Sequence, residues 1–294
     1  MAELPPRWGL DEFLELFDLE EVGDDVFRAQ NPERGPWTRV FGGQVAAQAI
    51  RAAQMTVPSD RVVHSAHAYF IRPGKVGEPI YLHVDRPRDG RSFTTRYIAA
   101  MQGSEVIFDM IASFHVHEEG PEYQAPRAMD VPSPEEAPEP TDMPPDFRPS
   151  RMRTMMPFDM RELGAQPPEA GAYRSTRRVW WRTVDRLPDD PAIHACVLAF
   201  ASDMGVVMAA RAPVEGESMW ETFTRFMSAS LDHAVWFHRS IRADDWILMD
   251  LRAISNSGAR GLAMGTMHTQ DGVLGVSIAQ EALIRPIPSE GPGK

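Results

Sequence analysis

Three polar residues in the second half of the chain could together activate a water molecule. Asp203 ends an apolar helical stretch, Ser230 precedes the start of an apolar segment, and Gln280 lies within a later alternating segment. A carboxylate can accept a proton from water, while a hydroxyl and an amide can hold that water by hydrogen bonds. Each residue also has an ordinary structural interpretation: a helix cap for Asp203, a turn for Ser230, and an amide satisfied by backbone for Gln280.

Gln280 stands out because of an internal repeat. Hairpin turns that begin at Gln102 and Gln270 are 168 residues apart. At that offset the apolar face of residues 106–116 recurs over residues 274–284, with Gln280 as the exception. A buried amide without partners would cost about 1–3 kcal/mol, so we expect groups that hydrogen-bond to it. One interpretation is a polar site between a helix and a sheet.

The repeat predicts two similar α+β halves, each with a central helix and a meander of antiparallel strands. In the first half, helical spacing of small and apolar residues predicts a buried helix from about Gly43 to Met55, and alternation predicts strands at 80–84, 93–99 and 106–116. In the second half, the same patterns predict a helix over 193–200 and strands near 230–237, 246–253, 259–268 and 273–284.

A segment rich in proline and acidic residues separates the halves at residues 125–150. Proline cannot donate to a sheet ladder, and such composition is typical of linkers. We therefore expect an N-terminal domain at residues 1–124 and a C-terminal domain at residues 151–294, in a chain long enough for two cores.

Several longer motifs resemble the type II acyl-CoA thioesterases, the TesB-like family. The first half carries Phe41-Gly42-Gly43-Gln44, His64 to Gly74, and Arg88 to Phe93; the second carries Ala201-Ser202-Asp203, Leu231-Asp232-His233, Trp236 to Arg239, and Thr269 to Leu274. These motifs follow family order from about residue 40 to residue 285. The resemblance therefore covers nearly the whole chain.

The resemblance implies a double hotdog fold, in which each half wraps an antiparallel sheet around a long helix. It also implies hydrolysis of fatty acyl-CoA by a catalytic trio of Asp, Thr or Ser, and Gln, which corresponds to Asp203, Ser230 and Gln280. In the mechanism that we expect, Asp203 accepts a proton from a water that Ser230 and Gln280 hold against the thioester carbonyl, without a covalent intermediate. No cofactor is required.

Substrate contacts are expected at Gly43, His67 and Arg91. Gly43 opens the first predicted helix, and His67 lies in one of the family motifs. Arg91 belongs to a local group of basic residues that could meet the anionic coenzyme A: Arg86, Arg88, Arg91 and Arg96. A solvated charged face is the ordinary interpretation of such a group.

Composition excludes other classes of function. A formal net charge of −12 disfavours binding to nucleic acid, which depends on clustered basic residues. No signal peptide or apolar run long enough for a membrane span is recognisable. The single Cys196 cannot form an internal disulfide, which fits the reducing cytoplasm. Histidine spacing supplies no convincing metal site.

Two alternatives to hydrolysis remain open from the sequence. A hotdog enoyl-CoA hydratase would share the fold and ligand but pair an Asp with a His. A non-catalytic acyl-CoA binding module would not need the trio. Sheet edges and faces left free by such a fold could support a homodimer or homotetramer.

Overall fold

The computed structural model describes residues 8–33, 39–127, 131–137, 156–164, 177–211 and 222–288. The first half comprises α1 (Leu10–Leu14), a 3-10 helix (Glu15–Phe17), β1 (Glu20–Gly23), β2 (Val26–Ala29), α2 (Gly42–Gln54), β3 (Arg61–Phe70), β4 (Ile80–Asp89), β5 (Phe93–Gln102) and β6 (Glu105–Val116). The second half comprises β7 (Phe158–Gly164), β8 (Arg177–Thr183), α4 (Pro191–Ser202), α5 (Val206–Ala210), α6 (Thr222–Arg225), β9 (Phe226–Ser230), β10 (Asp232–Phe237), β11 (Ile247–Ser257), β12 (Arg260–Thr269) and β13 (Leu274–Pro286).

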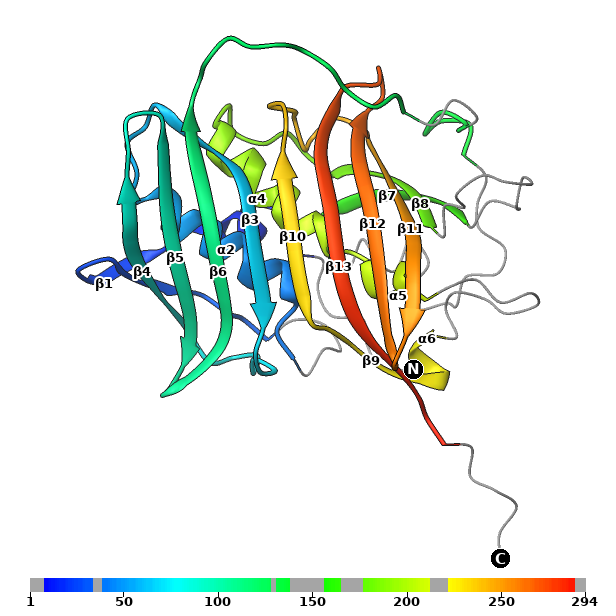
Figure 1. Ribbon diagram of the computed structural model, residues 1–294, viewed down its shortest axis with the longest axis horizontal. Coiled ribbons are helices and arrows are strands. Elements are labelled where there is room, and N and C mark those ends of the chain that lie inside the picture. The colour runs from blue at the N-terminus through cyan, green and yellow to red at the C-terminus, as the bar shows by residue number, and fades with distance from the viewer. Residues whose placement is uncertain are drawn as a thin grey trace, which may run out of the picture.

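One antiparallel sheet runs through both halves. Within the described residues its order is β1-β2-β4-β5-β6-β3-β10-β13-β12-β11-β8-β7, with β9 also paired to β13. The halves join where β3 pairs with β10, for example Ala66 with Val235. Figure 1 shows the sheet towards the viewer, with α2 and α4 behind it. The predicted antiparallel strands and the repeat are confirmed, because β6 and β13 occupy equivalent places on either side of the junction.

Two central helices lie antiparallel to each other beneath this sheet. Small side chains fill the buried positions of α2, among them Ala46, Ala49 and Ala53, which lets the helices approach closely. At one end the Gly43 N–H reaches Asp203, while at the other Gln54 Nε2 donates to Ala192 O. The predicted helices over about 43–55 and 193–200 are confirmed as α2 and α4. The start of α2 and the end of α4 therefore meet.

The chain crosses from the first half to the second along the end of the sheet at the top of Figure 1. Gln124 Nε2 donates to Gly272 O, and the Leu274 N–H donates to Gln124 Oε1. Farther on, Trp180 Nε1 donates to Pro132 O. Of the expected linker, residues 128–130 and 138–150 lie outside the described residues, and the described part contacts the second half.

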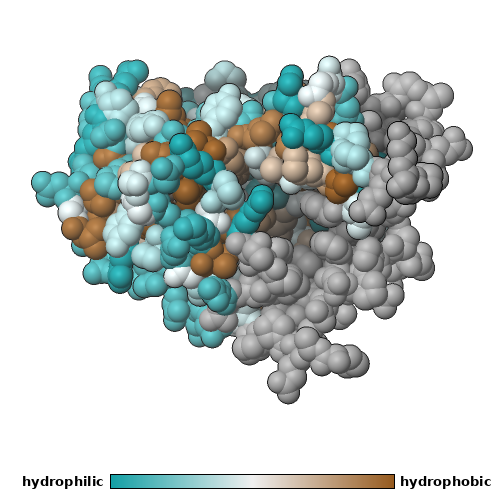
Figure 2. Space-filling model, turned by 90° about the horizontal axis from the view of Figure 1, so that it is seen from below, coloured by the Kyte–Doolittle hydropathy of each residue, from teal (hydrophilic) through white to brown (hydrophobic). Residues whose placement is uncertain are grey.

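The surface in view in Figure 2 mixes polar and apolar side chains, with apolar areas interrupted by polar ones. Among the described residues, no helix combines the length and the apolar character needed to cross a bilayer.

Candidate active site

The carboxylate of Asp203 lies between the meeting ends of α2 and α4. Asp203 is the C-cap of α4, its exposed fraction is 6%, and its Oδ2 accepts a hydrogen bond of 2.9 Å from the Gly43 N–H. A Cβ atom at Gly42 would lie 2.7 Å from that Oδ2, and one at Gly43 would lie 2.3 Å from the Phe200 carbonyl oxygen. The two glycines thus allow the start of α2 to approach the carboxylate.

Ser230 and Gln280 meet where β13 changes its neighbour. Residues 276–279 of β13 pair with β10, whereas residues 282–286 pair with β9. Gln280 lies between these two stretches and is fully buried. Its Nε2 donates to Ser230 Oγ over 2.8 Å. The fork in the sheet therefore places an amide beside a hydroxyl.

Backbone hydrogen bonds fix the link between β9 and β10 next to this amide. The Leu231 N–H donates to Glu281 O, and the Glu281 N–H donates to Asp232 Oδ1 over 2.6 Å. From the first half, the Phe70 N–H donates to Leu231 O. Hydrogen bonds that involve β3, β10 and β13 thus fix the backbone next to Ser230, and this helps to position its hydroxyl.

Burial raises the pKa of Asp203 to about 7, against opposing effects of the Gln280 amide, the Gly43 N–H and the Ser230 hydroxyl. Although Gln280 and Ser230 lie close enough to influence the charge, Oδ1 of Asp203 is buried and has no hydrogen-bond partner among the described residues. A carboxylate with a pKa near neutrality and a free acceptor position is suited to take a proton from a small donor such as water.

His233, for which the sequence left open a packing role or a role in supporting the site, belongs to the same network. Its Nδ1 lies 2.5 Å from Gln280 Oε1, and its Nε2 lies 2.7 Å from Ser202 Oγ. It is 2% exposed, and burial lowers its pKa to about 4, an effect that Gln280 partly opposes. The alternation of β10, in which His233 and Val235 face inward, is the sequence signal that could have placed it.

The structure does not bring His67 to the trio. His67 pairs with Ala234, which pairs with Ala279, so these three side chains share one face of the sheet. Gln280, the next residue along β13, points to the opposite face. The His67 ring instead contacts Trp236 edge to face, with 5.0 Å between ring centroids.

Arg91 likewise lies away from the trio. It occupies the exposed turn between β4 and β5, and its carbonyl accepts a hydrogen bond from Arg61, the first residue of β3. The trio lies near Phe70, at the other end of that strand. Of its basic neighbours, Arg86 pairs with Asp25, and the buried Arg96 donates to Thr56 and to Asp89. These two arginines stabilise the fold of the first half.

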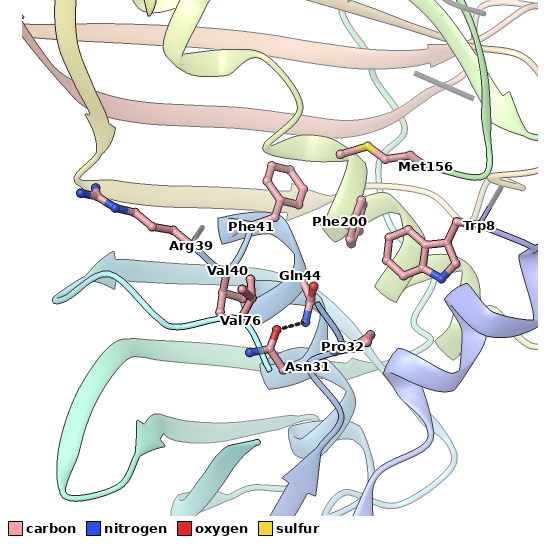
Figure 3. Close-up of a pocket in the computed structure, with 10 residues that line it drawn as sticks. All are labelled: Trp8, Asn31, Pro32, Arg39, Val40, Phe41, Gln44, Val76, Met156 and Phe200. Atoms are coloured by element: carbon pink, nitrogen blue, oxygen red, sulfur yellow. Dashed lines mark hydrogen bonds between the residues drawn. The ribbon is translucent and has the colours of Figure 1, made fainter. Parts of the chain in front are cut away.

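Figure 3 shows a pocket beside Phe41, at the start of α2, and Phe200, near the end of α4. Its empty space is about 380 Å³, a figure that includes open solvent. Asn31 and Gln44 are hydrogen-bonded to each other on one side. Its apolar lining consists of Trp8, Val40, Phe41, Val76, Met156 and Phe200. Phe41 precedes Gly42 and Phe200 precedes Asp203 by one turn, so the pocket adjoins the trio.

Comparison with known proteins gives the same family along most of the chain. Residues 33–115 match the model of the acyl-CoA thioesterase N-terminal domain, and residues 154–283 match the acyl-CoA thioesterase model. Acyl-CoA thioesterase 2 of Haemophilus influenzae is 34% identical over 94% of this chain and 98% of its own length. Human acyl-coenzyme A thioesterase 8 is 33% identical over 95% of this chain and 90% of its own length.

Solved structures agree with this assignment. The acyl-CoA thioesterase II TesB2 of Mycobacterium marinum has a TM-score of 0.79 and 36% identity, covering 94% of this chain and 98% of that one. A hot dog fold protein of Alicyclobacillus acidocaldarius, 22% identical with a TM-score of 0.73, covers the same shares of the two chains and supports the fold. The chain therefore belongs to the acyl-CoA thioesterase family and is a thioester hydrolase with the hot dog fold.

Proposed function

We propose that Asp203, Ser230 and Gln280 catalyse the hydrolysis of fatty acyl-CoA by activating a water molecule. The observation that supports this most directly is the buried, unpartnered Oδ1 of Asp203 beside the Ser230 hydroxyl and the Gln280 amide. A water at this position would have an acceptor for its proton and two groups to orient it. General-base catalysis of this kind contributes about 10²–10⁴-fold.

In the proposed reaction the water oxygen bonds to the thioester carbonyl carbon while one of its protons passes to Asp203. The tetrahedral intermediate then breaks the carbon–sulfur bond, and Asp203 returns the proton to the leaving thiolate. The products are a free fatty acid and coenzyme A. A pKa of about 7 suits a group that must accept and return a proton near neutral pH.

The developing oxyanion requires a hydrogen-bond donor. The Gly42 N–H is the first of α2 and makes no hydrogen bond within the described residues, whereas the Gly43 N–H is already bonded to Asp203. The N-terminus of a helix carries partial positive charge, which favours a negative oxygen. We infer that the Gly42 N–H donates to the carbonyl oxygen in the transition state.

We assign part of the acyl chain to the pocket of Figure 3. Its apolar walls suit a hydrocarbon chain, and its position beside Gly42 and Asp203 suits a substrate whose carbonyl carbon lies at the trio. Both halves contribute to it, through Phe41 and Phe200.

The wider biological assignments are also proposals. We propose two domains, residues 1–124 and 151–294, in an enzyme of cytoplasmic fatty acid metabolism. The single cysteine fits a reducing compartment. The outer face of the first half exposes Val62, Tyr69 and Ile111, which favours association into a homodimer or homotetramer.

The hydratase alternative fits the geometry less well. It would need a histidine free to exchange a proton beside Asp203, and both nitrogens of His233 already form hydrogen bonds. A measurement of turnover distinguishes the enzyme from the alternative of a non-catalytic acyl-CoA binding module.

The test measures coenzyme A release from acyl-CoAs of short, long and branched chains by wild type and Asp203→Asn, with acyl-CoA binding measured on the same preparations. We expect wild-type turnover that falls at least 10²-fold in the variant while binding persists. Binding without turnover by folded wild type would refute the enzyme. Near-normal turnover by Asp203→Asn would refute the general base.

A further inference from the structure

We propose that His233 is a positioning residue that fixes the Gln280 side chain with its NH2 group towards the catalytic carboxylate and its oxygen away from it. This inference rests on the proposed role of the trio, because it assigns the residue that keeps one of its members in a working orientation. His233 itself touches neither substrate nor water in this proposal.

Side chains from four separate elements form the network that supports this role. Ser202 at the end of α4 contacts His233 Nε2, His233 on β10 contacts Gln280 Oε1 through Nδ1, and Gln280 on β13 donates to Ser230. The exposed fractions of Ser202 and Gln280 are both 0%, and that of His233 is 2%. Water therefore cannot easily replace any of these partners.

The orientation of the Gln280 amide determines which His233 nitrogen carries hydrogen. Gln280 lowers the pKa of Asp203, which requires its NH2 group, not its oxygen, to face the carboxylate. Oε1 then faces His233 and needs a donor. Burial keeps the imidazole neutral, with a pKa of about 4, so it carries one N–H. That hydrogen must be on Nδ1, and Nε2 must accept from the Ser202 hydroxyl, whose single hydrogen then goes to Nε2 instead of to Ala199 O.

The opposite amide orientation is the competing arrangement. There the Gln280 NH2 group would donate to Nδ1, Nε2–H would donate to Ser202 Oγ, and Ser202 would donate to Ala199 O, which lies 2.8 Å away. All of these groups would be satisfied, but the Gln280 oxygen would face Asp203 and repel its charged form. Only the Nδ1–H form of His233 excludes this arrangement, because the Gln280 NH2 group and Nδ1–H are both donors and cannot bond to each other.

Loss of the Nδ1 donor should therefore impair catalysis rather than binding. Without it, Gln280 Oε1 is buried without a partner and the amide gains the freedom to turn. A misplaced catalytic group costs on the order of 10²-fold in rate, while the acyl pocket is unchanged. The expected signature is a fall in kcat with little change in KM.

Two amide substitutions separate the roles of the two ring nitrogens. The amide nitrogen of Asn is attached at the γ carbon, as Nδ1 is, so His233→Asn retains a donor for Gln280. The amide nitrogen of Gln lies one bond farther out, as Nε2 does, so His233→Gln retains only the contact with Ser202. His194→Asn is the control variant. His194 lies at the other end of α4, its exposed fraction is 6%, and its Nδ1 accepts a hydrogen bond from the Ala243 N–H.

We expect His233→Gln to lower kcat on the order of 10²-fold with KM within about twofold, His233→Asn to retain most of kcat, and His194→Asn to match wild type. Equal kcat values for His233→Asn and His233→Gln, or an effect on KM alone, would overturn the proposal.

The tautomer of His233 provides a measurement that does not depend on any variant folding or on activity. Nitrogen-15 NMR of histidine-labelled wild type near neutral pH distinguishes Nδ1–H from Nε2–H. The Nδ1–H form is the expected result, and the Nε2–H form would overturn the proposal. Because this result can be obtained even if wild type hydrolyses no acyl-CoA, failure of the positioning role and failure of the proposed function are distinguishable.

Discussion

Replacing Asp203 with Asn should stabilise the protein while it removes activity. The unfolded chain ionises Asp203 near its ordinary pKa of 3.8, whereas burial raises the folded-state pKa to about 7. Between these two values the folded state binds more protons than the unfolded state. The free energy of unfolding of wild type therefore falls as pH rises through that window. Asn keeps an oxygen for the Gly43 N–H but carries no titrating charge.

The magnitude follows from the two pKa values. Each unit of difference corresponds to about 1.4 kcal/mol, so the complete effect is about 4 kcal/mol above pH 7. The stability gained by Asp203→Asn over wild type should be small below about pH 4. It should then grow by up to about 1.4 kcal/mol per pH unit and level off near pH 7.

The assay is urea unfolding of both proteins at a series of pH values from 4 to 8.5, followed by tryptophan fluorescence. Asp244 provides a matched control of opposite sign. Its burial would raise its pKa, but hydrogen bonds from Arg242 and from the Leu187 N–H outweigh this effect and hold the pKa at about 2. The stability that its charge contributes is complete above about pH 4 and is lost as pH falls towards 2.

Asp244→Asn should therefore be less stable than wild type by an amount that is constant from pH 5 to 8. A constant difference for Asp203→Asn over the same range would instead mean that the pKa of Asp203 is not raised in the folded protein. Asp203 would then not be a buried base that titrates near neutral pH.

The raised pKa of Asp203 also predicts that kcat/KM rises with pH and reaches a plateau above about 7, measured as coenzyme A release from one acyl-CoA. Gly43→Ala should lower both activity and thermal stability, because its Cβ would meet the Phe200 carbonyl at 2.3 Å; activity and melting temperature measured together check this. Cys196 should resist a thiol reagent in the native protein and react after unfolding, since burial raises its pKa to about 12. Val76→Phe should shift the acyl-CoA preference towards shorter chains by reducing the pocket, with little change in stability; kcat/KM across chain lengths tests it.

The elements that the sequence predicted are those with a regular period. α2 and β13 each have one buried face, and Gln280 was found because it interrupts such a face. β8 was not predicted, because six of its seven residues are buried and the strand shows no alternation of polar and apolar positions. Arg177, at its start, is buried because it pairs with Glu162 and donates to Met204 O. No local pattern reveals such a pair.

The same contrast, between local sequence patterns and contacts made by distant parts of the chain, explains which parts of the site could be predicted. The family resemblance indicated Asp203 and Ser230, but the partner of Asp203 is a backbone N–H from the other half of the chain, 160 residues away in sequence. The positions of His67 and Arg91 relative to the trio have the same origin. Both belong to family motifs, yet sheet register decides on which face and at which end a side chain lies, and register is not readable from one strand. Their contact with substrate stays a prediction.

The two halves contribute different kinds of groups to one site. The second half supplies the carboxylate, hydroxyl and amide side chains, while the first half has Ala112 at the position that corresponds to Gln280. What the first half supplies is the backbone of α2: the Gly43 N–H holds Asp203, and the close approach of Gly42 covers the carboxylate. Because this burial is the main cause of the raised pKa, the strength of Asp203 as a base depends on the packing of α2 against α4. Both halves of such a repeat are therefore required even where one half lacks the polar side chains, because those side chains acquire their chemistry from the contact between the halves.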